Sequence, residues 1–81
     1  MFYKQLMQAL DDLPEKELIT GSFFDGACFC AVGAMRRLAK KENRDPPPGN
    51  IHTAKTITVN DEFKGTNEER FTHVYDWAKS Q

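Results

Sequence analysis

The amino-acid sequence predicts a single, mainly α-helical (α+β) domain with three principal helices and a short β-hairpin or strand element. Two segments carry apolar residues at the spacing of one helical face, and a third begins with a helix-capping motif. The segments between them are rich in glycine, proline and β-branched residues, which are typical of turns and strands. A chain of 81 residues is enough for one domain, spanning 1–81, and too short for two.

The first predicted helix covers residues 2–13. Its apolar side chains follow the i, i+4, i+7, i+8, i+11 spacing of one helical face. These residues are Phe2, Leu6, Ala9, Leu10 and Leu13. Pro14 disfavours helical geometry in the residue before it, so we expect the helix to end near Asp12 or Leu13.

The next segment, Ile19 to Phe24, predicts a short hairpin or strand, because its β-branched and aromatic residues favour extended backbone. Asp25-Gly26 is typical of a turn. A second helix is then expected over Ala27–Lys41. Gly33 in its interior costs helix stability, which indicates that another element passes close to it.

The sequence ENRDPPPGN, residues 42–50, breaks this helix, because three consecutive prolines favour polyproline geometry. Residues 51–59 then alternate between Ile51, Ile57 and Val59 on one parity and polar residues on the other. This alternation favours a strand. Asn50 could equally cap a short helix, so that alternative stays open.

The last helix begins at a capping box formed by Thr66 and Glu69, in which each side chain accepts the other residue's free backbone N–H. Together with the apolar stripes of the other segments, its apolar face defines the expected core. The expected core residues are Phe2, Leu6, Leu10, Leu13, Cys28, Val32, Met35, Leu38, Ile57, Val59, Phe71, Val74 and Tyr75.

The two cysteines in GACFCAVGAM allow three interpretations. If both are helical, Cys28 and Cys30 point about 200° apart, so they cannot chelate one metal together or form a disulfide with each other. Cys28 or Cys30 at a helix start could act as a nucleophile with His52 or His73 as base, which is the enzyme alternative. The favoured interpretation is structural, with Cys28 in the core and Cys30 on the opposite side. We expect no metal and no cofactor.

Basic side chains gather on the outer face of the second predicted helix, at Arg36, Arg37, Lys40 and Lys41. They could bind a phosphate backbone, which is the nucleic-acid alternative. The sequence, however, shows no binding motif and no interleaved aromatic residue beyond Phe29. A basic helix face that is simply solvated is the simplest interpretation. Binding of an acidic protein is the next, and binding of a nucleic acid is the least favoured of the three.

The basic face, with Arg36, Arg37 and Lys40, is one predicted contact surface for a protein partner, and two others are predicted. Arg70, His73 and Trp77 lie at i, i+3 and i+7 along the last helix, and arginine and tryptophan are residue types that often anchor interfaces. Phe23 and Phe24 beside a turn form the second candidate, because adjacent strand residues face opposite ways and leave one ring, taken here as Phe24, outside.

Three motifs resemble those of a loose group of small phage and prophage proteins. They are F-x-D-G-x-C-F-C-A-V-G-A at residues 23–34, V-N-D at residues 59–61 and T-N-E-E-R-F-x-x-V-x-x-W at residues 66–77. The resemblance covers about two thirds of the chain and supplies no active site. It implies a host-takeover or defence-blocking factor that works by binding a host protein.

The charge balance excludes a strong whole-molecule field, because eleven basic residues face twelve acidic ones and the net charge is −1. The sequence shows no signal peptide and no membrane span, so a cytoplasmic location without membrane contact is expected, in the host cytoplasm if a phage encodes the chain. We therefore predict a non-enzymatic protein-binding module, an inhibitor or modulator of a host protein.

Overall fold

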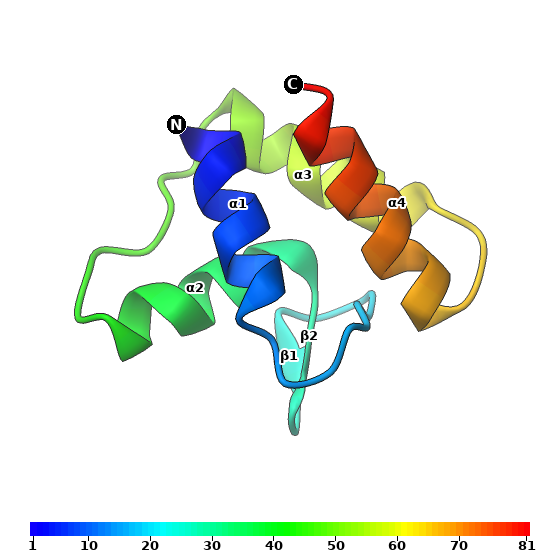
Figure 1. Ribbon diagram of the computed structural model, residues 1–81, viewed down its shortest axis with the longest axis horizontal. Coiled ribbons are helices and arrows are strands. Elements are labelled where there is room, and N and C mark those ends of the chain that lie inside the picture. Colours follow the sequence, from blue (N-terminus) through cyan, green and yellow to red (C-terminus); the bar gives the residue numbers. More distant parts are fainter.

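The computed structural model describes all of residues 1–81 and contains four helices and one two-stranded antiparallel hairpin (Figure 1). In chain order the elements are α1 (Phe2–Asp11), β1 (Phe24–Asp25), β2 (Cys28–Phe29), α2 (Ala31–Lys41), α3 (Ile51–Glu62) and α4 (Asn67–Lys79). Both α1 and α3 pack against α2 and α4. The mainly α-helical class with a short hairpin is thus confirmed, but the β element expected over Ile19–Phe24 was misplaced, because the strands that pair are Phe24–Asp25 and Cys28–Phe29. No helix is both long enough and apolar enough to cross a lipid bilayer.

The hydrophobic core lies between α1, α2 and α4 and also takes in Leu18 from the segment after α1. The buried cluster consists of Leu6, Ala9, Leu10, Leu13, Leu18, Ala31, Ala34, Met35, Leu38, Val74 and Ala78. Some predicted core residues lie only at its edge, partly buried, namely Phe2, Val59, Phe71 and Tyr75. The prediction was wrong for Ile57, which is 38% exposed.

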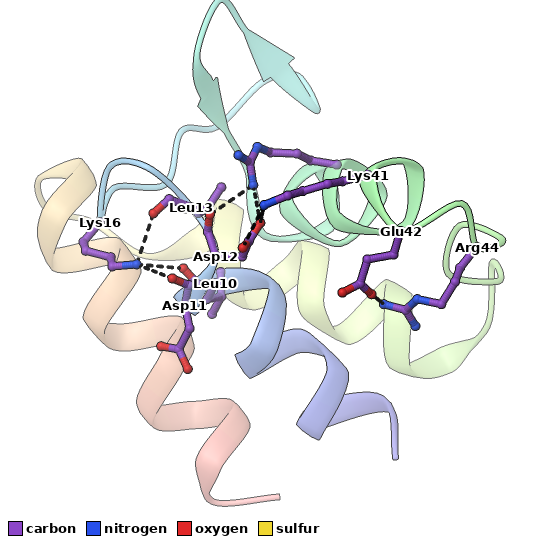
Figure 2. A network of polar contacts seen from close by, with 9 residues as sticks. Leu10, Asp11, Asp12, Leu13, Lys16, Lys41, Glu42 and Arg44 are labelled. Atoms are coloured by element: carbon purple, nitrogen blue, oxygen red, sulfur yellow. Dashed lines mark hydrogen bonds and ion pairs between the residues drawn. The ribbon is translucent and has the colours of Figure 1, made fainter.

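Helix α1 ends at Asp11, one residue earlier than the expected boundary, with Asp12 as its C-cap. The Lys16 ammonium group folds back beneath this end and donates hydrogen bonds to the carbonyl oxygens of Asp11 at 2.6 Å and Leu13 at 3.1 Å (Figure 2). A helix end leaves carbonyl groups without intrahelical partners, and a lysine there satisfies them and interacts favourably with the helix dipole.

The hairpin pairs Phe24 with Phe29 and Asp25 with Cys28 across a turn in which Gly26 has a positive φ of 63°. Because residues 28 and 29 are held in this ladder, α2 begins at Ala31, and the predicted start at Ala27 was wrong. A Cβ on Gly33 would lie 1.8 Å from the Phe23 carbonyl oxygen. The prediction that another element passes close to Gly33 is therefore confirmed, and that element is the hairpin.

Residues 51–62 form helix α3, so the strand favoured for residues 51–59 was wrong and the alternative of a helix capped by Asn50 was right. The Asn50 side chain accepts the backbone N–H groups of His52 at 3.0 Å and Thr53 at 3.1 Å. The buried residues of α3 are polar: Thr53, Thr56 and Asn60.

Asn60 joins α3 to the start of α2 and to the segment before the hairpin. Its Oδ1 accepts the backbone N–H of Ala31 at 3.0 Å, and its Nδ2 donates to the carbonyl oxygen of Ile19 at 3.0 Å. The first N–H groups of a helix have no intrahelical partner, so Asn60 provides a cap for α2 from a distant part of the chain. This contact holds the hairpin, α2 and α3 in a fixed arrangement.

Helix α4 begins as predicted. The Thr66 hydroxyl accepts the Glu69 N–H at 3.1 Å, and the Glu69 carboxylate accepts the Thr66 N–H at 2.8 Å, so both halves of the capping box are formed. These two hydrogen bonds satisfy two backbone donors at the helix start.

Candidate functional site

The cysteines lie differently from the sequence-based expectation. Cys30 is 7% exposed and is the N-cap of α2, where its sulfur accepts the Gly33 N–H at 3.2 Å, whereas Cys28 is only half buried in β2. The placement of Cys28 in the core and of Cys30 on the opposite side was therefore wrong. Burial raises the pKa of the Cys30 thiol, although its hydrogen bonds to Gly33 and Val32 act in the other direction. A raised pKa disfavours the thiolate, which is the nucleophilic form. No group of three or more histidine, cysteine or acidic side chains is placed to hold a metal ion.

Arg70 was expected on an exposed contact surface, but its side chain is buried. It is 8% exposed and donates a hydrogen bond to the carbonyl oxygen of Leu18 at 2.9 Å and another to the side-chain oxygen of Asn67. The expectation that Arg70 lies on an exposed contact edge was wrong, because the segment around Leu18 and the loop before α4 cover it. The sequence could not show this, since Leu18 is 52 positions away.

The other two residues of that edge have separate environments. The exposed His73 ring stacks on Phe63, with ring centroids 4.5 Å apart. Trp77 is half buried and packs edge-on against Tyr3 of α1, with ring centroids 5.1 Å apart. Arg70, His73 and Trp77 therefore do not form one continuous exposed surface.

The second predicted candidate and the basic face come together in one place. Phe24 of the hairpin and Arg36, Arg37 and Lys40 of α2 all line an open hollow of about 840 Å³, which we call the hairpin–α2 groove. The hairpin forms one wall and the outer face of α2 forms the other, and Asn43, Arg44 and Pro46 from the segment after α2 also line the groove. Five basic side chains line it and no acidic one does: Arg36, Arg37, Lys40, Lys41 and Arg44.

Three of these five charges are already paired. Asp12 accepts hydrogen bonds from Arg37 at 2.7 Å and from Lys41 at 3.2 Å, and Glu42 pairs with Arg44 at 2.6 Å (Figure 2). The hydrogen bonds from Arg37 and Lys41 lower the pKa of the Asp12 carboxyl, so this acid stays charged at neutral pH. These contacts fix the outer end of α2 against the end of α1.

The two remaining cations, Arg36 and Lys40, make no ion pair and no side-chain hydrogen bond. They lie four residues apart on one helix and therefore occupy neighbouring positions on one face. The Arg36 guanidinium lies over the Phe23 ring at 4.7 Å from its centroid, a cation–π contact that joins α2 to the segment at the start of the hairpin.

The aromatic wall consists of the hairpin residues. Phe24 is 64% exposed and Phe23 is 44% exposed, while Phe29 lies at the edge of the core with its ring centroid 6.3 Å from that of Phe24. The sequence indicates no aromatic residue beside the basic face except Phe29, and the folded chain adds Phe23 and Phe24. The close approach expected at Gly33 was the sequence feature that could have revealed this, because Phe23 is the residue that approaches it.

The fold and this groove define a small helical domain with one surface that is both basic and aromatic. No family model, curated protein or solved structure matches the chain. The chemistry of the groove is therefore the basis for the proposal that follows.

Proposed function

We propose that the protein is a non-enzymatic protein-binding module whose contact surface is the hairpin–α2 groove. The observation that carries the proposal is that the exposed Phe24 ring and the unpaired Arg36 and Lys40 line the same groove. Large exposed aromatic rings next to arginine are typical of interface anchors, whereas single exposed charges on a helix are not.

The groove is also held rigidly, which favours specific binding because little conformational entropy is lost on association. Its hairpin wall is fixed to α2 by the hydrogen bond from the Cys30 N–H to the Phe23 carbonyl oxygen at 3.1 Å and by the close contact at Gly33. Its helical wall is fixed to α1 through Asp12. A partner can therefore bind to a surface that already has its final shape.

The chemistry of the groove favours an acidic protein over a nucleic acid. Nucleic-acid affinity depends on the number of phosphates that the protein neutralises, and Asp12 and Glu42 already occupy three of the five cations. The further proposal that the partner is a host protein inhibited or modulated by a phage factor is supported by the resemblance of residues 23–34, 59–61 and 66–77 to small phage proteins.

Affinity capture from the lysate of a candidate host bacterium tests this function. The immobilised wild-type protein is compared with the groove variants Phe24→Ser and Lys40→Glu and with the control variants Ile51→Ser and Lys55→Glu on the exposed face of α3. We expect a captured protein that is lost with both groove variants and retained with both controls, all four variants showing wild-type circular dichroism. A captured protein that the groove variants retain would show that the contact surface lies elsewhere.

A further inference from the structure

We infer that the partner presents an extended acidic segment in which carboxylate and large apolar side chains alternate, and that this segment lies along the hairpin–α2 groove. The inference rests on the proposed function, because it names the chemistry of the partner for the same surface. It follows from the different chemistry of the two walls, basic on α2 and aromatic on the hairpin.

The spacing of the unpaired cations matches an extended chain. Arg36 and Lys40 are separated by four residues of an α-helix, which corresponds to a rise of about 6 Å. In an extended segment, side chains two residues apart lie on the same side and are separated by about 6.6 Å. Two carboxylates at positions i and i+2 can therefore reach Arg36 and Lys40 together.

The residue between these two carboxylates points in the opposite direction, because successive side chains of an extended segment alternate. In the groove that direction leads to the hairpin wall, where the Phe24 ring is exposed, whereas the Phe23 ring already lies under the Arg36 guanidinium. A large apolar side chain at this position covers the Phe24 ring, and the removal of apolar surface from water favours association.

Three heptapeptides of defined sequence test the inference by titration into the ¹⁵N-labelled full chain, followed by amide chemical shifts. The probe GSEWEGS has the alternating pattern, GSEEWGS has the same composition with the pattern broken, and GSKWKGS has the opposite charge. We expect GSEWEGS to shift the amides of Phe24, Arg36 and Lys40 at millimolar concentration, GSEEWGS to bind severalfold more weakly and GSKWKGS to shift nothing in the groove.

Neutral variants of the two cations extend the test. An exposed ion pair adds little affinity, so Lys40→Gln should weaken GSEWEGS binding about threefold and the double variant Arg36→Gln/Lys40→Gln about tenfold. Lys55→Gln on α3 is the matched control and should leave the affinity unchanged. Equal binding of GSEWEGS to the wild type and to the double variant would overturn the inference.

Two further outcomes would also overturn it. The first is equal affinity for GSEWEGS and GSEEWGS, which would show that the groove does not recognise the alternation of carboxylate and apolar side chains. The second is tighter binding of a twelve-nucleotide oligothymidylate to the same amides, which would identify the groove as a single-strand nucleic-acid surface that uses stacking on Phe23 and Phe24. If the lysate capture depends on Phe24 and Lys40 but no acidic peptide binds, the proposed function stands and only the inference fails.

Discussion

Arg70 connects three parts of the chain by a single buried side chain. Its guanidinium donates to the Leu18 carbonyl, to the Asn67 side chain and, at longer distances, to the carbonyls of Phe63 and Gly65 before α4. No carboxylate lies within ion-pair distance of it, and its Nε has no partner. A buried charge is tolerated only where hydrogen bonds replace its hydration, so these carbonyl groups determine the stability of this region.

Replacing Arg70 with methionine should therefore destabilise the fold although the new side chain is apolar and of similar length. The Leu18 carbonyl would be buried without a donor, and we expect the free energy of unfolding to fall by about 2–4 kcal/mol. Urea denaturation followed by circular dichroism measures this loss. Lys64→Met, a change at an exposed position of the adjacent loop, is the control, and a similar small effect of both substitutions would show that Arg70 has no such role.

Gly33 gives a second residue-scale prediction. Alanine normally stabilises a helix relative to glycine by up to about 1 kcal/mol, but here its Cβ would meet the Phe23 carbonyl at 1.8 Å. Gly33→Ala should destabilise the protein by about 2 kcal/mol or more, because either the hairpin or α2 must shift. Gly49→Ala is the matched control, since nothing lies within 4 Å of a Cβ at that position. Equal melting temperatures of the two variants would contradict the close contact.

The capping box of α4 makes the stability of an element depend on pH. Accepting the Thr66 N–H lowers the pKa of Glu69 below its ordinary value of 4.5. A group with a lowered folded-state pKa contributes stability that is fully present above its ordinary pKa and is lost as the pH falls through the folded-state value. Glu69→Gln should therefore reduce the loss of stability on acidification below pH 4.5, relative to the wild type.

Thermal denaturation at neutral pH and at several values below pH 4.5 measures this difference. Glu68→Gln, a change to an exposed neighbour whose side chain makes no hydrogen bond, should retain the acid sensitivity of the wild type. Thr66→Ala should lower the free energy of unfolding by about 1 kcal/mol at neutral pH, because it removes the N-cap acceptor. Parallel acid profiles for Glu69→Gln and the wild type would show that the capping box is not a source of the pH dependence.

The elements that the sequence predicts well are those whose evidence is local. Helices α1 and α4 follow from apolar spacing and from the Thr66 capping box, which involve residues a few positions apart. The start of α2 was misplaced because the pairing of Cys28 with Asp25 competes with helix formation, and helical spacing alone does not show that competition.

Helix α3 shows why an apolar pattern can mislead. Its buried residues are Thr53, Thr56 and Asn60, while Ile51 and Ile57 are exposed, so hydrophobicity does not mark the face that packs against the rest of the molecule. The Thr56 hydroxyl donates to the His52 carbonyl at 2.8 Å and Asn60 bonds to two distant backbone groups, so each buried polar side chain has a partner. The two partners of Asn60 lie 29 and 41 positions away in the sequence, so no periodicity reveals them.

At the scale of the whole molecule, the candidate site was predictable in its parts but not in its assembly. Phe24 and the basic residues Arg36, Arg37 and Lys40 were separate expectations, and the docking of the hairpin onto α2 joins them in one groove. Long-range packing also buries Arg70, so this residue is not part of the exposed surface that was predicted. The residue types in the sequence thus indicate which side chains are suited to bind a partner, whereas the packing of distant segments decides which of these side chains are exposed.

The reactivity of Cys30 depends on the stability of the whole domain, because the hairpin, α2 and α3 all meet at its position. Its sulfur is buried at the start of α2, where Asn60 caps the Ala31 N–H. A domain of this size has a stability of roughly 4–12 kcal/mol, so alkylation of Cys30 that requires global unfolding should be slowed at least about 1,000-fold. The half-buried Cys28 should react much faster.

Iodoacetamide labelling of the single-cysteine variants Cys28→Ser and Cys30→Ser, followed by mass spectrometry, measures the two rates. We expect labelling of Cys30 to rise with urea concentration along the same curve as unfolding measured by circular dichroism. Labelling that does not depend on urea would show that the start of α2 opens locally. Rapid labelling of Cys30 at neutral pH in the folded protein would instead support the thiol-enzyme alternative, because only a stabilised thiolate reacts quickly under those conditions.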